Sequence, residues 1–209
     1  MLYPQILAKF ENEFALYLPD PDQVKPTYEY LRLKDASTPF PFWAKIWPSA
    51  IGMTAFLKKE PHWIEGKHVL ELGAGIGLPS FMMAGLASEM IISDHAIEAV
   101  KLIEKNIQLL GLQQVKARCL DWNDFPDGIR VDTLLLSDIN YAPDQFGPLL
   151  LLIEKFLAQG TTIILATPQR ITATAFVERI QPYIQRAILL PDNDSQQEIA
   201  ISILILSID

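Results

Sequence analysis

A glycine-rich segment is the part of the sequence best suited to bind a small ligand. It spans residues 71–79 and reads E-L-G-A-G-I-G-L-P, directly after an apolar run. Glycines at this spacing allow a tight turn and let a ligand approach the backbone closely. An ordinary turn between a strand and a helix is the alternative, and three alternating glycines make it the weaker one. We therefore expect Gly73, Ala74, Gly75 and Gly77 to surround a ligand.

The spacing of the glycines and the acid before them indicate which ligand this is. The dinucleotide pattern GxGxxG, which presents a helix N-terminus to a pyrophosphate, would need a glycine where Leu78 stands. The carboxylate of Glu71 would repel a pyrophosphate, but it suits the ammonium and the sulfonium of S-adenosylmethionine. The segment therefore predicts S-adenosylmethionine as the cofactor, with Glu71 beside it. Glu71 could instead cap a neighbouring backbone group.

Acidic and aromatic residues after the next two expected strands could complete this binding site. Asp94 stands about twenty residues beyond the loop, where a carboxylate can accept hydrogen bonds from ribose hydroxyls. It could also cap the helix that begins at Ala96. Asp121 and Trp122 follow the third strand, where they could contact the adenine amino group and cover the base. The alternatives are a solvated Asp121 and a Trp122 that belongs to the core.

Asp138 and Tyr141 are the residues best placed to act on a methyl acceptor. They follow the fourth expected strand, at the centre of the sheet, where the ligand crevice of such folds opens. Methyl transfer needs an aligned acceptor, and a lysine ammonium must first lose its proton. Asp138 could orient the amine, and Tyr141 could offer a π face to the methylated ammonium. A turn cap before Pro143 and simple packing are the respective alternatives.

Four segments together resemble the class I, seven-β-strand methyltransferases, and among them the methyltransferase-like family of protein lysine methyltransferases. These segments are residues 43–49, 69–79, 120–122 and 137–141. The resemblance implies an acceptor on a protein lysine, with Asp138 and Tyr141 facing the substrate. It also implies that Trp47 lies over the cofactor and that Ser137 contacts it.

One position departs from the pattern of that family. Its members often have a Glu shortly before an Arg after the fifth strand, and here Pro168 precedes Arg170 at that place. An acid there would help to hold a lysine. Its absence keeps two alternatives open, namely a small-molecule acceptor and a non-catalytic cofactor-binding module.

The elements that must position these residues alternate between strand and helix from residue 67 onward. Strands are expected at 67–72, 90–93, 115–120, 131–137, 161–167, 184–190 and 198–207, and helices at 78–86, 96–110, 148–157 and 173–182. Gly111 should end the second of these helices. Such alternation predicts an α/β fold with a Rossmann-like, doubly wound sheet of seven mostly parallel strands. The short turn at 191–194 leaves no room for a helical crossover, so the C-terminal strand should be antiparallel.

The first 60 residues are richer in proline and aromatic residues than the rest of the chain. We expect a helix at 4–17, an extended segment at 27–33 and a helix at 49–59. This segment, 1–60, should pack on the methyltransferase core of 61–209 and form a lid over the cofactor, within a single domain.

Composition and charge exclude several other classes of protein. Half of the 209 residues are apolar, 20% are charged and the mean hydropathy is +0.18, which indicates a globular chain. No apolar run reaches the ~20 residues that span a bilayer, and the N-terminus does not resemble a signal peptide. The net charge of −8 argues against a nucleic acid partner.

Cysteine and histidine usage indicates the compartment and argues against a metal site. The single Cys119 cannot form an intramolecular disulfide and fits the cytoplasm. His62, His68 and His95 do not form a zinc-binding pattern. We therefore expect a cytoplasmic methyltransferase with no metal, acting on protein lysine, as a monomer or weak oligomer.

Overall fold

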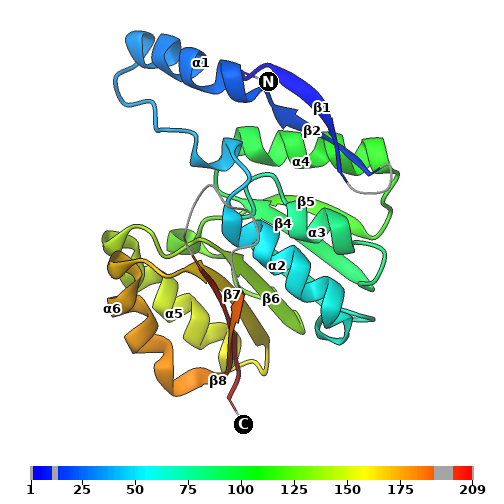
Figure 1. The fold of residues 1–209 in the computed structure, drawn as a ribbon, viewed down its shortest axis with the longest axis vertical. Helices are drawn as coiled ribbons and strands as arrows, with labels where there is room; N and C mark the ends of the chain where they lie inside the picture. The colour runs from blue at the N-terminus through cyan, green and yellow to red at the C-terminus, as the bar shows by residue number, and fades with distance from the viewer. Residues whose placement is uncertain (1, 11–13, 191–199, 209) are drawn as a thin grey trace.

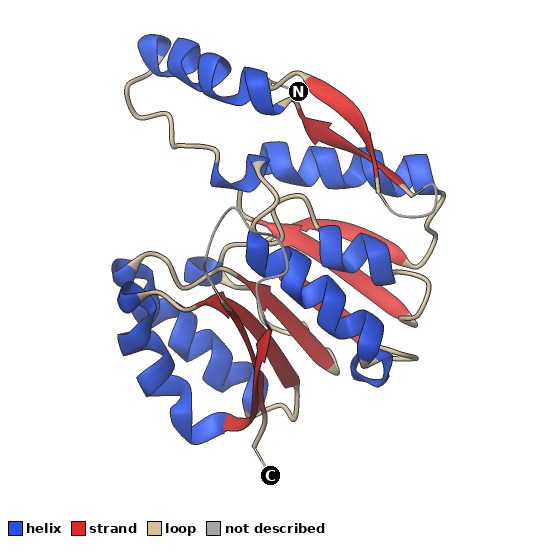
Figure 2. Ribbon diagram, viewed as in Figure 1, coloured by secondary structure: helices blue, strands red, loops and turns tan. Residues whose placement is uncertain are grey.

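A seven-stranded sheet with helices on both faces forms the centre of the molecule (Figures 1 and 2). The computed structural model describes residues 2–10, 14–190 and 200–208. The strands are β3 (His68–Leu72), β4 (Glu89–Asp94), β5 (Val115–Cys119), β6 (Thr133–Ser137), β7 (Thr162–Pro168), β8 (Ile184–Leu190) and β9 (Ile201–Leu206). All described neighbours in this sheet pair in parallel except β9, which is antiparallel to both of its partners. The predicted fold class is confirmed.

The strand order, β5-β4-β3-β6-β7-β9-β8, reverses direction between β3 and β6. The chain moves outward from β3 to β4 and β5, and then returns to the other side of β3 with β6. In such sheets the crevice that binds ligands opens at the carboxyl ends of the strands beside this reversal. β9 lies between β7 and β8, with Ile163 opposite Leu206. The turn predicted at 191–194 falls outside the described residues.

The helices divide between the two faces of the sheet (Figure 2). On one face lie α2 (Pro48–Lys59), α3 (Leu78–Met83) and α4 (Ile97–Leu110), and on the other lie α5 (Phe146–Leu157) and α6 (Ile171–Ile180). Single 3₁₀ turns occur at Phe42–Ala44, Pro61–Trp63, Trp122–Asp124, Pro143–Gln145 and Gln181–Tyr183.

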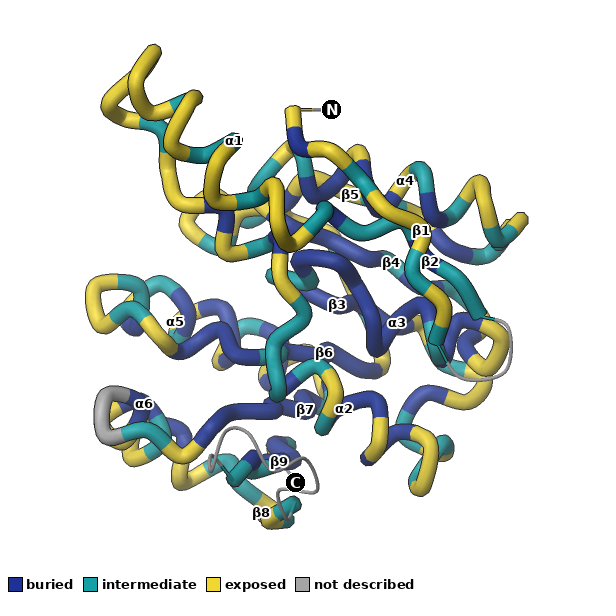
Figure 3. The backbone as a smooth tube through the Cα atoms, turned by 45° about the horizontal axis from the view of Figure 1, so that its top comes forward, coloured by how far each residue is buried: buried dark blue, intermediate teal, exposed yellow. Residues whose placement is uncertain are grey.

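Alternating side chains of the central strands β3, β6 and β7 supply a hydrophobic core on each side of the sheet, so these strands are buried on both faces (Figure 3). The edge strands β5 and β8 are buried much less. In β3, Val69 packs with α2 and α3, whereas Leu70 and Leu72 pack with α5. Gly111 ends α4 in the left-handed conformation, with φ of 64°, as predicted. None of the helices in the described part of the chain is long and apolar enough to cross a membrane.

The helix predicted at 4–17 is wrong, because this segment forms an antiparallel hairpin. Its strands are β1 (Gln5–Lys9) and β2 (Ala15–Pro19). The side chain of Asn106 on α4 accepts a hydrogen bond from the Tyr17 amide at 2.8 Å and donates one to its carbonyl at 3.0 Å. The conformation of this segment therefore depends on the pairing of β2 with β1 and on the contact of β2 with α4. Neither interaction can be read from the local sequence.

The extended segment predicted at 27–33 is also wrong, because it belongs to helix α1 (Pro21–Lys34). Asp20 caps this helix by accepting from the Asp22 amide at 3.1 Å, and Pro21 occupies the first turn, where a missing N–H costs nothing. No residue of α1 is buried, and Figure 3 shows it as a largely exposed arm. The helix predicted at 49–59 is confirmed by α2.

Candidate active site

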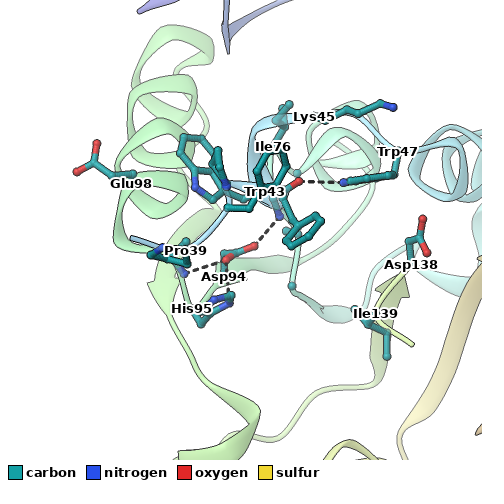
Figure 4. Close-up of a pocket in the computed structure, with 18 of the residues that line it drawn as sticks. Pro39, Trp43, Lys45, Trp47, Ile76, Asp94, His95, Glu98, Asp138 and Ile139 are labelled. Atoms are coloured by element: carbon teal, nitrogen blue, oxygen red, sulfur yellow. Dashed lines mark hydrogen bonds and ion pairs between the residues drawn. The ribbon is translucent and has the colours of Figure 1, made fainter. Parts of the chain in front are cut away.

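A cleft of about 620 Å³ opens at the carboxyl ends of β3, β4 and β6. Its floor comes from the loop after β3 and its rim from residues 38–47 of the N-terminal segment (Figure 4). This volume lies within the range of about 300–1,000 Å³ that small-molecule sites occupy. All of the site residues predicted from the sequence line this cleft except Glu71.

The loop after β3 needs glycine both for its backbone conformation and for its close contacts. Gly75 and Gly77 have φ of 56° and 78°, in the left-handed region that favours glycine. A Cβ on Gly77 would lie 2.8 Å from Cγ2 of Ile92, and one on Gly75 would lie 3.0 Å from the carbonyl oxygen of Trp43. The loop is therefore packed tightly between β4 and the N-terminal segment.

Glu71 lies beneath this loop and does not line the cleft. It is buried, and its Oε2 accepts a hydrogen bond from the Ser80 amide at 3.2 Å, at the start of α3. Its Oε1 has no hydrogen-bond partner among the described residues. Burial raises the pKa of Glu71 to about 7. The contact present is the capping alternative, and a contact with the cofactor stays a prediction.

Asp94 lies in the cleft and also holds two backbone amides (Figure 4). Its Oδ2 accepts from the Gly75 amide at 2.8 Å, and its Oδ1 accepts from the Ala96 amide at 2.9 Å. Burial raises the pKa of its carboxyl, although these hydrogen bonds act in the opposite direction. Asp94 therefore fixes the glycine loop to the end of β4 and holds the Ala96 amide just before α4, while its carboxylate borders the space predicted for ribose. The predicted capping alternative is not the contact present, because α4 has no side-chain cap hydrogen bond at its N-cap residue, Ala96.

Asp121 and Trp122 border the same cleft from the end of β5. Asp121 is exposed, and its Oδ1 accepts from the Asn123 amide at 2.8 Å. Trp122 is half-buried, and its Nε1 donates to Oε1 of Gln145 at 3.0 Å. The Trp122 ring therefore has a fixed orientation at the wall where the adenine contact is predicted.

Trp47 and Ser137 both line the cleft. Trp47 precedes α2, is half-buried, and its Nε1 donates to the Phe42 carbonyl at 2.9 Å (Figure 4). Ser137 ends β6, and its buried Oγ has no hydrogen-bond partner among the described residues. A buried hydroxyl without a partner is costly, so Ser137 has a hydrogen bond to offer a ligand.

Asp138 has a strained backbone that fixes its carboxylate at the mouth of the cleft. Its φ is 55°, and it is the only described residue other than glycine with a positive φ. Its amide donates to the Ala166 carbonyl at 2.9 Å, and its buried carboxylate faces Arg170, with Oδ1 3.4 Å from Nη1. Burial raises the pKa of the Asp138 carboxyl, and the Arg170 guanidinium opposes that shift.

Tyr141 forms part of a smaller cavity beside the cleft. This cavity has a volume of about 90 Å³ and is lined by Phe42, Trp47, Asp138, Tyr141 and Arg170. The Tyr141 ring lies 5.5 Å from that of Phe42, centroid to centroid. The cavity thus combines three aromatic walls with one carboxylate and one guanidinium.

Sequence reasoning did not single out Phe42, Gln145 or Asn140. Phe42 stands in the aromatic-rich stretch, which gave a weak signal. Asn140 is buried, and its Oδ1 accepts from the Thr167 hydroxyl at 2.9 Å, which joins the loop after β6 to β7. The sequence draws attention to Arg170 only because Pro168 precedes it. Its contact with Asp138, from the start of α6 to the end of β6, has no local signal.

The charge of the cleft fits S-adenosylmethionine. Its described acidic lining residues are Asp94, Glu98, Asp121 and Asp138, whereas Lys45 and His95 are its basic ones. A surplus of carboxylates suits a ligand with an ammonium and a sulfonium and would repel a pyrophosphate. The described residues contain no group of acids, histidines and cysteines arranged to hold a metal ion.

The family of the chain follows from a comparison with known proteins. A family profile described as lysine methyltransferase matches residues 30–183. The chain belongs to this lysine methyltransferase family. The family recognised from the sequence is therefore confirmed, and S-adenosylmethionine is its cofactor.

Two relatives and one solved structure illustrate the range of this family and fold. The electron transfer flavoprotein beta subunit lysine methyltransferase of Mus musculus is 28% identical over 160 residues, 75% of this chain and 62% of that protein. The protein N-lysine methyltransferase METTL21A of Xenopus tropicalis is 29% identical over 131 residues, 61% of each chain. The N-methyltransferase NodS of Bradyrhizobium japonicum, solved with S-adenosyl-L-homocysteine, shares the fold with a TM-score of 0.62 at 13% identity, covering 86% of this chain and 97% of that one. The chain spans between 27% and 62% of the length of the curated relatives it matches.

Proposed function

We propose that this chain transfers a methyl group from S-adenosylmethionine to the side-chain amine of a protein lysine. The observation that carries the proposal is the buried carboxylate of Asp138, which borders both the cofactor cleft and the small aromatic cavity. A carboxylate and aromatic rings attract an ammonium group. The description of the family profile and the names of the two relatives given above support a lysine acceptor.

The proposed cofactor contacts lie along the carboxyl ends of the strands. The residues there are Gly73, Ala74, Gly75, Gly77, Asp94, Asp121, Trp122 and Ser137. Trp47 would contribute from just before α2, and Glu71 from beneath the glycine loop. When bound, S-adenosylmethionine supplies an activated methyl group. The role of the chain is to hold that group in line with the acceptor nitrogen and to keep water away from both.

Asp138 and Tyr141 are proposed to act on the acceptor. Asp138 would accept a hydrogen bond from the lysine nitrogen and hold it towards the cleft, and its fixed backbone would keep that direction. The rings of Tyr141 and Phe42 would enclose the methylene groups and the ammonium. The nitrogen must be neutral when it attacks, so its proton has to leave first, to Asp138 or to water.

The experiment that tests the function is methyl labelling of a lysate from the native host. The purified chain and tritiated S-adenosylmethionine are added, and the labelled species is identified by mass spectrometry. Methyl-lysine in a protein is the expected product. Label in a small molecule would replace the proposal with the small-molecule alternative. Cofactor binding without any labelling would favour the non-catalytic module.

The Asp138→Asn variant tests the role of the carboxylate, because it keeps the shape and removes the charge. We expect the affinity for S-adenosylhomocysteine to stay within about threefold and the turnover to fall by roughly 10²–10⁴, the range for positioned acid–base groups. If turnover is unchanged, the lysine-directed role of Asp138 is wrong. If affinity and turnover fall together, Asp138 is a cofactor ligand.

Four further expectations remain proposals. Residues 38–47 line the cleft, which supports a lid formed by the segment 1–60. The exposed, unpaired thiol of Cys119 supports a cytoplasmic location. The net charge of −8 supports a protein rather than a nucleic acid partner, and light scattering would test the expected monomer or weak oligomer.

A further inference from the structure

The ion pair between Arg170 and Asp138 joins a partly exposed guanidinium to a buried carboxylate at a long distance. The guanidinium atoms Nη1 and Nη2 lie 3.4 Å and 3.5 Å from the two carboxylate oxygens. Charge-assisted N–H···O⁻ bonds are usually about 2.7–2.9 Å long. The Arg170 side chain is 33% exposed, whereas that of Asp138 is 6% exposed. The guanidinium can therefore move into water at low cost, and the carboxylate cannot.

The backbone fixes the position of Asp138, whereas the Arg170 guanidinium lies at the end of a long side chain. Asp138 sits at the end of β6 with its amide bonded to Ala166 on β7. Arg170 stands at the start of α6, and its long side chain reaches across to β6. Among the described residues, no other group donates a hydrogen bond to the Asp138 carboxylate. If Arg170 leaves, that carboxylate needs another cation, because a buried charge without a partner is costly.

The small cavity between these groups has room for such a cation. Its walls are the rings of Phe42, Trp47 and Tyr141, and its volume is about 90 Å³. Its lining contains one carboxylate, and Pro168 supplies no second one. Two cations cannot share a single buried carboxylate without repelling each other. An ammonium that enters the cavity must therefore compete with Arg170.

We propose that Arg170 is the resident counter-ion of Asp138, which the ammonium of an incoming acceptor side chain replaces and which returns when the product leaves. The inference rests on the proposed function for the chemistry of the acceptor. Arg170 is then a positioning residue that selects against weak binders and helps to expel the product. The carboxylate is paired with Arg170 while the cavity is empty, and with an ammonium when the acceptor enters and again when the methylated product has formed.

The exchange is tested with n-butylammonium, which has the four-carbon stem and the charged group of lysine. The protein is loaded with S-adenosylhomocysteine, and NMR signals of Asp138 and Tyr141 are followed during titration at constant ionic strength. Arg170→Gln should bind the amine roughly tenfold more tightly than the natural chain, because no resident cation has to leave. Arg170→Lys, which restores the charge, should return the affinity towards the natural value.

The controls separate exchange from a structural role of Arg170. In the Asp138→Asn background, Arg170→Gln should make no difference to amine binding, because the counter-ion has lost its partner. S-adenosylhomocysteine affinity must be unchanged in each variant that is compared. The Arg170→Gln variant should unfold at a lower temperature, because Asp138 then has no partner, so all titrations are made well below the unfolding transition of the least stable variant. Where Arg170→Gln changes the cofactor affinity, Arg170→Ala replaces it.

Two results would overturn the inference. Weaker amine binding by the Arg170 variants would mean that Arg170 braces Asp138, and equal binding would mean that the two cations do not compete. Neither result depends on turnover. The lysate labelling therefore tests the proposed function separately, and methyl-lysine found there together with equal amine binding would leave the function standing and remove the exchange.

Discussion

Glu71 is a buried carboxyl group whose charge changes near neutral pH. Its pKa is about 7, above the ordinary value of 4.5, because burial disfavours the charged form. The folded state therefore holds a proton between these two values that the unfolded state has lost. The free energy of unfolding should fall as the pH rises from 4.5 to 7, by about 3 kcal/mol from this group.

The Glu71→Gln variant should remove this dependence. An amide keeps an oxygen for the Ser80 amide and has no charge to bury. We expect the variant to be the more stable protein at pH 8 and to lose its advantage near pH 4.5. Urea unfolding at several pH values measures the difference in unfolding free energy between the two proteins. The other titrating groups are common to both, so their contributions cancel in this difference. Parallel stability curves for the two proteins would show that Glu71 keeps an ordinary pKa.

Asp94 combines a structural and a proposed binding role at a single residue. Asp94→Ala should weaken S-adenosylhomocysteine binding by roughly ten- to hundredfold, as expected for lost charge-assisted hydrogen bonds of about 1.5–3 kcal/mol. Calorimetry measures the affinity. Thermal unfolding of the ligand-free protein measures the stability lost with the hydrogen bonds from the Gly75 and Ala96 amides to Asp94. A less stable protein with unchanged affinity would mean that Asp94 only holds these two amides and does not contact the cofactor.

At the scale of elements, the chain uses two kinds of left-handed glycine. Gly77 and Gly111 have φ of 78° and 64°, so alanine is strained at both. A Cβ on Gly77 would meet Ile92 at 2.8 Å, whereas one on Gly111 would meet nothing within 4 Å. The first glycine allows close packing, and the second only ends a helix.

These two positions form a matched pair of variants. Gly111→Ala should cost about 1–2 kcal/mol of stability from backbone strain alone. Gly77→Ala should cost about 1–3 kcal/mol more, because it overpacks the contact between the loop and β4. Urea unfolding measures both. Equal losses would mean that the buried Ile92 side chain moves aside.

The central elements were predictable because their sequence signals are local. Apolar runs of strand length followed by glycine or acidic residues predict β3 and β4, and Gly111 predicts the end of α4. The hairpin β1–β2 was not predictable, because its conformation depends on pairing and on contact with α4. The apolar residues of these two short strands are spaced so that they are equally compatible with a short amphipathic helix.

The gathering of the site residues was predictable for the same topological reason. The carboxyl ends of parallel strands meet at one edge, so Asp94, Ser137 and Asp138 had to lie close together. The position of Glu71 was not evident, since a strand buried on both faces gives no sign of which face a residue takes. The reach of Arg170 to Asp138 was not evident either, since it depends on a long side chain that extends from the start of α6.

At the scale of the whole molecule, Asn106 joins the N-terminal hairpin to the sheet domain. Asn106→Ala removes both hydrogen bonds to Tyr17 and leaves a buried gap, which should cost about 2–4 kcal/mol. Compared with the natural chain, amide hydrogen exchange in the variant should accelerate more in β1 and β2 than in β3. The exposed Glu104 on the same helix provides the control, and Glu104→Ala should change neither quantity. Uniform acceleration across the sheet would contradict a hairpin held mainly by Asn106.

The position of β9 has a consequence for how the protein is made. β9 is paired on both sides, with β7 and β8, although it follows both of them in the sequence. While a ribosome is synthesising the chain, β7 can pair with β6 as soon as both have emerged, but its other edge waits for residues 201–206. That edge belongs to an apolar strand, and an open apolar edge readily pairs with other chains. Until residues 201–206 have left the exit tunnel, the nascent chain should therefore be at its most prone to pair with other chains along that edge of β7.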